Sequence, residues 1–291
     1  MNKKSVLYLG GGSMAGVFGA GIVTRLQEQD AYDKIGTIYG ASAGAFNMAY
    51  FLSRQTRLGS SIYYENLTEN FINAKKILSG TVQRFYNRFI SQISNEKMCN
   101  PIDIGYLLEI AKNRKTLDLE AVKNNPINAF VKVFNLNTKK IEYLDLKSDI
   151  FQRLKEAVSV IPYYFPDNQE FIDGEVISPI DFDTIRGFHS YEKIIVCINH
   201  SPKEGITRKT RNNLEGLVAT MMYKDIPLIR IFSGKTKKIN QEIEKIKKDK
   251  DSLLIYPPEN NPSGNSTTDK EKLLITYEMG QIEAEKILDF I

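Results

Sequence analysis

Histidine and cysteine are scarce in this sequence of 291 residues, which contains two of each. Cys99 and Cys197 lie far apart and show no metal-ligand spacing, so we expect free thiols in a reducing compartment. The two histidines, His189 and His200, are too few to build the ligand cluster of a catalytic metal. The composition therefore disfavours a metal hydrolase and predicts no metal site.

Long hydrophobic runs are also missing. None approaches the roughly 20 residues that span a bilayer, so we expect no transmembrane segment. The start, MNKKSVLYLGGG, lacks the long apolar region and cleavage site of a signal peptide, which predicts a cytoplasmic protein. The net charge of +4 is mild and alone implies no nucleic-acid partner. Hydrophobic residues at 42% and charged residues at 25% are ordinary for a globular protein with a continuous core.

The first 53 residues alternate between strand and helix patterns. Short buried strands are expected at 6–9 and 36–39, and helices at 17–27 and 45–53. Each strand runs into a glycine-containing turn before its helix. This order predicts an α/β fold with a parallel sheet.

The rest of the chain continues this mixed pattern. A strand pair is expected at 129–134 and 141–146, joined through Asn137 and Thr138. Thr268 and Glu271 predict a capping box for a last helix that runs to residue 291. The polar and aromatic region 56–98 is expected to form helices and loops over one side of the sheet. Further buried strands are expected at 193–198, 228–232 and 252–256.

A glycine-rich loop, GGGSMAG at 10–16, follows the first strand. Such a loop exposes backbone N–H groups at a helix start, and this predicts binding of an anion, either a phosphate or a developing oxyanion. A purely structural glycine-rich turn is the alternative. Dinucleotide binding would also require an acidic residue at the end of the second strand. The sequence there is TIYGAS, with no acid, so an NAD(P)-dependent oxidoreductase is disfavoured.

A second motif, GASAG at 40–44, has the G-x-S-x-G form between a strand and a helix, as a nucleophile elbow requires. Ser42 would need a base to take its proton. Only one strand precedes Ser42, which makes an ordinary α/β-hydrolase topology improbable. His200 follows a strand and could take part, although a surface or loop histidine is the more frequent case. A small-residue turn for close helix packing is the alternative for the whole motif.

A third motif is the pair Asp173-Gly174, after Phe171 and Ile172. It can end a strand in a turn that holds the carboxylate by backbone hydrogen bonds. A purely structural Asx-turn is the alternative.

The order of these three motifs resembles that of the patatin-like phospholipase family. The segment at 157–166 is similar to the one that precedes the family's Asp-Gly pair, and 173–180 resembles the D-G-G-x-x-D-P-I run of a bacterial branch. Residues 252–291 are similar to the end of that branch. The resemblance implies a three-layer α/β/α fold around a mostly parallel sheet, with the glycine-rich loop and the elbow at the C-terminal ends of strands. It also implies one domain over 1–291, with a catalytic core at about 5–200 and a C-terminal extension at about 201–291.

The resemblance further implies an activity and a site. Ser42 would be the nucleophile and Asp173 the base, while the N–H groups of Gly11, Gly12 and Ser13 would bind the oxyanion. The substrate would be an acyl ester of a lipid, met at a membrane surface, with no metal, no cofactor and no nucleic acid. The remaining motif glycines are Gly10, Gly16, Gly40, Gly44 and Gly174.

Four positions depart from the family pattern. Ala15 stands where Arg or Lys is frequent, Ser13 where a third glycine is usual, Glu175 at the second glycine of D-G-G, and Asp181 where the branch often has proline. The nucleophile and the base are retained, but the shape and charge of the oxyanion loop differ. A non-catalytic lipid-binding or regulatory protein that keeps the fold is therefore the alternative function.

A lysine-rich segment covers 235–250, with Ile239, Ile243 and Ile246 at helical spacing. We expect an amphipathic helix packed on the core, and a basic surface for anionic headgroups is the alternative. The aromatic side chains of 56–98 could form a lid or an acyl pocket, or pack in the core. Arg208, Lys209 and Arg211 form a small basic patch of no assigned use.

Overall fold

The computed structural model describes residues 4–72, 100–164, 170–190, 192–202, 215–217, 219–220 and 228–291. Cys99, the basic patch at 208–211 and residues 73–98 of the aromatic region lie outside these ranges. A seven-stranded sheet is formed by β1 (Ser5–Leu9), β2 (Ile35–Gly40), β3 (Asn128–Asn135), β4 (Lys140–Asp145), β5 (Phe171–Asp173), β6 (Ile194–Cys197) and β7 (Ser252–Ile255).

Helices surround this sheet. They are α1 (Val17–Glu28), α2 (Ala43–Leu52), α3 (Thr56–Ser61), α5 (Ile104–Glu109), α6 (Leu119–Asn124), α7 (Ile150–Ala157), α8 (Gly174–Ile177), α9 (Phe182–Phe188), α11 (Leu228–Lys248), α12 (Lys270–Glu283) and α13 (Glu285–Phe290). Short 3-10 turns occur at Ser13–Gly16, Ala31–Lys34 and Leu146–Ser148, and π-helical turns at Ile62–Asn66 and Ile110–Arg114.

The sheet is mostly parallel. Its order is β4-β3-β2-β1-β6-β7, and the pairs among β3, β2, β1, β6 and β7 are all parallel. Both β4 and β5 pair with β3 in the antiparallel direction. The expected pair at 129–134 and 141–146 is thereby confirmed, and the Asn135 side chain closes its turn by accepting from the N–H groups of Asn137 and Thr138.

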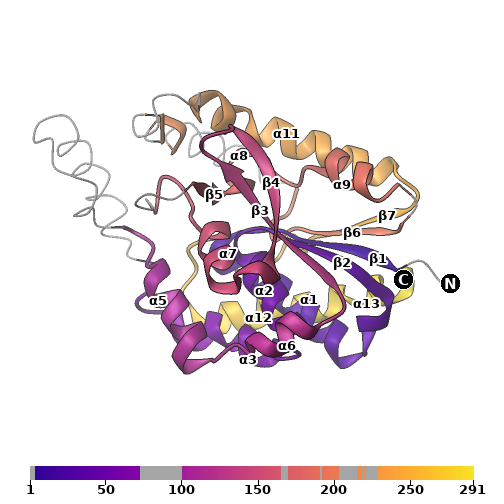
Figure 1. Cartoon of the computed structure of the whole chain (residues 1–291). Helices are drawn as coiled ribbons and strands as arrows, with labels where there is room; N and C mark the ends of the chain where they lie inside the picture. Colours follow the sequence, from indigo (N-terminus) through magenta and orange to yellow (C-terminus); the bar gives the residue numbers. More distant parts are fainter. Residues whose placement is uncertain are drawn as a thin grey trace, which may run out of the picture.

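Both faces of the sheet are covered, so the fold has three layers (Figure 1). Leu7 and Leu9 of β1 face the core beneath α1, α2 and α12. Val6 and Tyr8 alternate with them and face the core that α9 and α11 cover. Because side chains of a strand alternate between faces, this double covering explains why β1 is apolar throughout. The predicted α/β/α architecture is confirmed.

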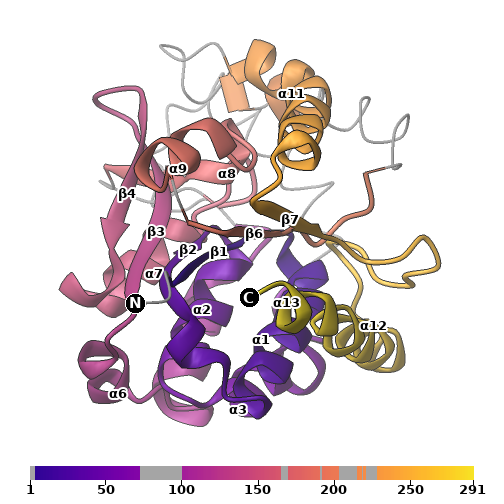
Figure 2. The ribbon, with the colours of Figure 1, turned by 90° about the vertical axis from the view of Figure 1, so that its right-hand side faces the viewer.

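The C-terminal residues join the same sheet and core. α12 lies against α1, the helix that follows the glycine-rich loop (Figure 2). A Cβ added to Gly21 of α1 would lie 2.0 Å from the Tyr277 carbonyl oxygen, and one added to Gly280 of α12 would lie 2.1 Å from that of Phe18. Leu273 of α12 and Ile287 of α13 are fully buried in the same core. The division into a core and an extension stays a prediction.

Three details of the expected elements are wrong. Residues 228–232 (LIRIF) begin the long helix α11 rather than form a strand. Leu228 and Phe232 are buried one helical turn apart. An apolar run of five residues cannot distinguish the repeat of buried positions in a helix from that in a strand. The cap of α12 is Asp269, whose side chain accepts from the Lys272 N–H, so Thr268 lies outside the helix. The last helix is also divided between α12 and α13.

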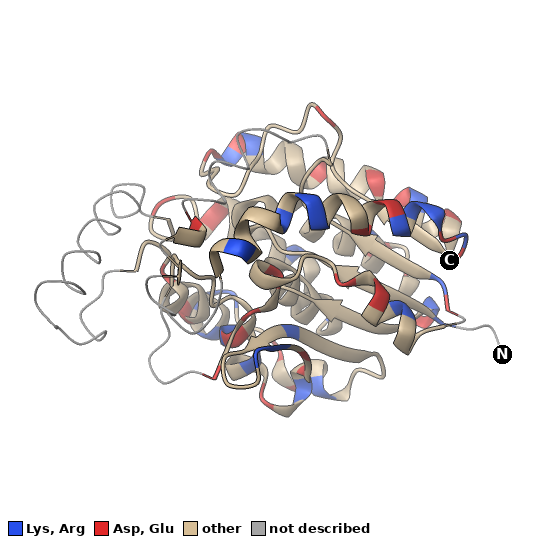
Figure 3. Cartoon of the chain, turned by 90° about the horizontal axis from the view of Figure 1, so that it is seen from above, with Lys and Arg blue, Asp and Glu red and all other residues tan. Residues whose placement is uncertain are grey.

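The lysine-rich segment forms most of α11, and Ile243 and Ile246 pack on the sheet as expected of an amphipathic helix. Its exposed side carries both basic and acidic residues along its length (Figure 3). Lys245 pairs with Asp183 and Glu242, and Lys247 with Glu244. These pairs favour a solvated helix face over a uniformly basic one.

Candidate active site

Ser42 lies at a tight turn between β2 and α2. Its backbone has φ 50° and ψ −124°, a region that costs a non-glycine residue free energy. The neighbouring small residues permit the turn, because a Cβ at Gly44 would lie 2.0 Å from the Leu9 carbonyl oxygen. Ser42 therefore stands at the N-terminus of α2 on a strained strand–helix elbow, as the G-x-S-x-G motif predicts.

The register of the sheet brings Asp173 to the same place. Gly40, at the end of β2, pairs with Val131 of β3, and Asp173 of β5 pairs with Val133. Because β4 occupies the other edge of β3 here, β5 continues the line of β2. Asp173 consequently lies just beyond the end of β2, beside Ser42.

Asp173 is 2% exposed, and its Oδ1 accepts from the N–H of Glu175 at 2.8 Å. Burial raises the pKa of Asp173 to about 7, and the negative charge of Glu175 adds to this rise. A side-chain hydrogen bond with Ser42 and the Glu175 N–H oppose it. A carboxylate with a pKa near neutrality is a far better proton acceptor than a free aspartate.

The glycine-rich loop at 10–12 is held from behind by Asn199. The Asn199 amide nitrogen donates to the carbonyl oxygens of Gly10 and Gly11 at 2.8 and 2.9 Å, and its oxygen accepts from the Gly19 N–H at 2.9 Å. The loop turns through Gly12 at φ 142°. Sequence reasoning missed Asn199, although its position directly after Ile198, at the end of a strand, was a usable signal.

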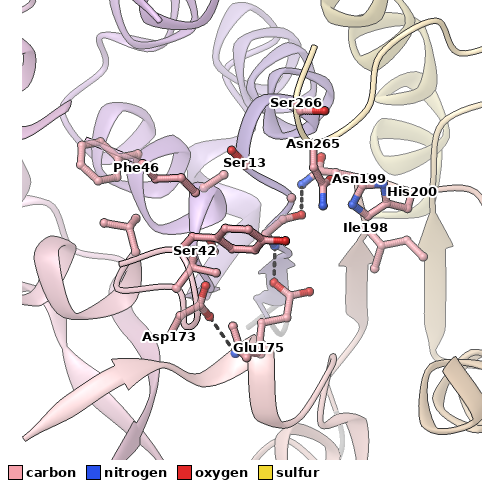
Figure 4. A pocket seen from close by; sticks show the side chains of 18 of the residues that line it. Ser13, Ser42, Phe46, Asp173, Glu175, Ile198, Asn199, His200, Asn265 and Ser266 are labelled. Atoms are coloured by element: carbon pink, nitrogen blue, oxygen red, sulfur yellow. Dashed lines mark hydrogen bonds between the residues drawn. The ribbon is translucent and has the colours of Figure 1, made fainter. Parts of the chain in front are cut away.

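Glu175 occupies one of the three predicted oxyanion donors. The N–H of Gly11 donates to the Glu175 carboxylate (Figure 4). Among the described residues, no protein group accepts from the N–H of Gly12 or Ser13. The Ser13 hydroxyl oxygen is buried and also makes no hydrogen bond within the described protein.

Lys132 is a buried cation behind these carboxylates. Burial lowers its pKa to about 8, and the charges of Glu175, Asp181 and Asp173 oppose that effect. Its ammonium group donates to the Ser178 carbonyl oxygen. The sequence contained a weak signal, since Lys132 interrupts the apolar strand AFVKVF.

Ser42, Asp173 and Glu175 line a cavity of about 240 Å³ (Figure 4). Its polar wall also includes Asn199, His200, Lys235, Asn265 and Ser266. The larger apolar wall includes Phe46, Tyr50, Ile62, Tyr63, Leu67, Phe71, Ile72, Ile102, Ile104, Leu107, Val158 and Ile161.

The apolar wall gives the aromatic region 56–98 a role within its described part. Tyr63 and Phe71 line the cavity and are also buried in the core, so packing and pocket formation are not alternatives here. Nothing in the described part assigns a lid.

The two histidines differ in location. His200 follows β6 and lies beside the loop, since a Cβ at Gly12 would be 3.1 Å from its Nε2. His189 is hydrogen-bonded to the Tyr39 hydroxyl at 2.9 Å and is not among the cavity-lining residues of the described structure. Within the described ranges, no group of three His, Cys, Asp or Glu side chains is arranged to hold a metal ion. Cys197 is buried in β6.

The remaining motif glycines take backbone roles. The N–H of Gly10 donates to the Cys197 carbonyl oxygen at 2.9 Å, and Gly16 packs against Ala43 and Tyr63. Gly40 faces the start of α2, and Gly174 faces the β3 backbone. In the described part of the chain, none of the helices has the length and apolar character needed to cross a bilayer.

Comparison with known proteins identifies the family. The family model described as patatin-like phospholipase matches residues 7–186, which include all three motifs. The chain therefore belongs to the patatin-like phospholipase family, and the resemblance inferred from the motifs is confirmed.

Two solved structures are similar to the chain at low identity. VipD from Legionella pneumophila is similar at a TM-score of 0.49 and 11% identity, over 98% of this chain and 67% of that one. The type III effector protein ExoU is similar at a TM-score of 0.31 and 13% identity, over 82% of this chain and 54% of that one. No curated protein matches the chain.

Proposed function

We propose that this protein is a serine hydrolase that cleaves acyl esters of lipids through a Ser42–Asp173 dyad. One observation carries the proposal: the strained elbow presents Ser42 to a buried Asp173 at the edge of an apolar cavity. Family membership supports a lipid hydrolase. The roles of the individual residues are our inference.

In the first half-reaction, the Ser42 hydroxyl attacks the ester carbonyl while Asp173 accepts its proton. The tetrahedral intermediate then expels the alcohol part of the lipid, which takes the proton from Asp173 and leaves an acyl-enzyme. In the second half, Asp173 accepts a proton from water as the water attacks this ester. Expulsion of Ser42 with that proton releases the fatty acid and restores the dyad.

The oxyanion would be bound by backbone N–H groups of the glycine-rich loop, namely those of Gly11, Gly12 and Ser13. The positive end of α2 adds to their effect near Ser42. The apolar wall of the cavity would hold the acyl chain, because burying methylene groups there removes them from water. The substrate would be taken from a membrane surface.

The alternative, a lipid-binding protein without catalysis, draws on a specific observation. The Glu175 carboxylate occupies the Gly11 N–H that the oxyanion would need. A protein in which this contact never opens would retain the cavity but lose the chemistry.

The deciding experiment measures fatty-acid release from mixed phospholipid vesicles in the presence of a chelator. Wild type, Ser42→Ala and Asp173→Asn would be compared, with Ser233→Ala and Asp33→Asn as matched controls on exposed sites. We expect release by wild type and both controls, and a loss of roughly 10⁴-fold or more in the dyad variants.

Equal release by wild type and the dyad variants would contradict the proposal. No release by any folded protein, together with unchanged vesicle binding by Ser42→Ala, would favour the non-catalytic alternative.

A further inference from the structure

Glu175 lies at the centre of the candidate site although no step of the proposed mechanism uses it. Its carboxylate accepts the hydrogen bond of the Gly11 N–H, and its own N–H donates to Asp173. A Cβ added to Gly11 would be 2.5 Å both from Glu175 Oε2 and from the Ser42 Cβ. The carboxylate is therefore beside the nucleophile, where the substrate's carbonyl oxygen would have to lie.

A carboxylate and an oxyanion compete for the same donor. Both are negatively charged oxygen acceptors, and a charge-assisted hydrogen bond to a backbone N–H is among the stronger ones. A fixed negative charge at this point would also repel the charge that develops in the tetrahedral intermediate. The observed contact is thus incompatible with an occupied oxyanion site.

We propose that the Glu175 carboxylate is an internal ligand of the oxyanion site, and that Ser42 reacts only after this side chain has left Gly11. The inference rests on the proposed function of Ser42 and Asp173. It assigns a role to the departure from the family's D-G-G pattern, where a glycine would leave the site open.

The surroundings of Glu175 allow such a movement. The residue is half-buried and lines the cavity, so its side chain can turn into that space without unpacking the core. A cationic side chain is available on the cavity side, because Lys235 of α11 lines the same cavity. The neighbouring Asp173 disfavours a second negative charge at Gly11, because the two carboxylates repel each other.

The test uses a fluorophosphonate ester on the full chain. Attack by Ser42 forms an O–P bond and breaks the P–F bond, releasing fluoride, while Asp173 takes the serine proton. The adduct places its polar phosphoryl oxygen in the oxyanion site without requiring any particular lipid. Intact-mass measurement over time gives the rate, and Ser42→Ala shows whether the label is on Ser42.

Three variants separate the obstruction from its charge. Glu175→Gly empties the site, Glu175→Gln keeps the shape without the charge, and Glu170→Gln removes a carboxylate near β5 that bonds to Asn135 instead. We expect labelling about 10- to 100-fold faster in Glu175→Gly, an intermediate rate in Glu175→Gln and no change in Glu170→Gln.

A second measurement does not depend on reactivity. The amide proton of Gly11 in the ¹⁵N-labelled protein should move upfield in Glu175→Gly, because it loses a charged acceptor, and should stay in place in Glu170→Gln. Melting temperatures confirm that each variant is folded.

Labelling of both Glu175 variants at the wild-type rate, or more slowly, would overturn the proposal while leaving the dyad assignment intact. Absence of Ser42 labelling in every folded protein would instead reject the proposed function, and this inference with it.

Discussion

Asn199 uses its whole amide group to hold the glycine-rich loop. Its three hydrogen bonds are buried, and they join the end of β6 to Gly10, Gly11 and Gly19. In a planar trans peptide the C=O and N–H groups point in opposite directions. By fixing the carbonyls of Gly10 and Gly11, Asn199 aims the N–H groups of Gly11 and Gly12, which are two of the three proposed oxyanion donors.

Replacing Asn199 should therefore impair turnover more than substrate binding. We expect Asn199→Ala to lower kcat by about 10²–10³-fold, the usual effect of losing one oxyanion donor, with a small change in KM. Asn199→Asp should lower kcat to a similar extent, since a carboxylate cannot donate to the two carbonyl oxygens. Steady-state kinetics on a short-chain ester would measure both constants.

Asn135→Ala is the matched control. Asn135 is equally buried and its amide makes three hydrogen bonds, but two of these close the turn between β3 and β4 and the third is donated to Glu170. It should lose stability while keeping kcat. A similar kcat in Asn199→Ala and wild type would show that Asn199 only stabilises the fold.

At the scale of elements, the contact between α1 and α12 fixes the helix that follows the glycine-rich loop. The helices cross where Gly21 and Gly280 face each other's backbones. We expect Gly21→Ala to destabilise the protein by about 1–3 kcal/mol or more, because the added methyl group meets the Tyr277 carbonyl oxygen. The free energy of unfolding in urea gives the value.

The sign of this change is informative because alanine normally favours a helix. Gly234 of α11 has nothing within 4 Å of an added Cβ, so Gly234→Ala should stabilise by about 0.5–1 kcal/mol. Stabilisation by Gly21→Ala would mean that α1 and α12 are not in close contact.

Most elements could be predicted from the sequence because their signals are local. β1, β2, α1 and α2 follow from apolar runs punctuated by glycines, and their order already implies a parallel sheet. The strand predicted at 228–232 was wrong because these five residues fit both a strand and the first turns of α11. Its helical character depends on the isoleucines farther along α11, which lie outside this short run.

The candidate site was predictable only in part, for a related reason. Ser42 and Asp173 belong to recognisable motifs. The roles of Asn199, Lys132 and Glu175 depend on contacts across the sheet, such as Asn199 with Gly10 and Glu175 with Gly11. No local pattern encodes such partners. Glu175 was visible only as a departure from the D-G-G pattern.

The whole molecule incurs a stability cost for burying Asp173. The sheet closes this carboxylate off from water and sets it beside Glu175, which raises its pKa from 3.8 to about 7. Between these values the folded protein holds a proton that the unfolded chain releases. Stability attributable to this group is therefore greatest below pH 4, falls as pH rises, and is fully lost above pH 7.

Asp173→Asn should consequently be inactive and yet more stable at neutral pH. Its neutral amide can still accept the Glu175 N–H but never ionises, so its stability advantage over wild type should be near zero at pH 4. The advantage should grow to as much as a few kcal/mol by pH 8. Urea unfolding of both proteins across this range gives the difference.

In a Glu175→Gln background the growth of this stability difference with pH should be smaller, since one cause of the raised pKa of Asp173 is gone. A difference that does not vary with pH would show that the Asp173 carboxyl ionises in the folded protein as it does in water.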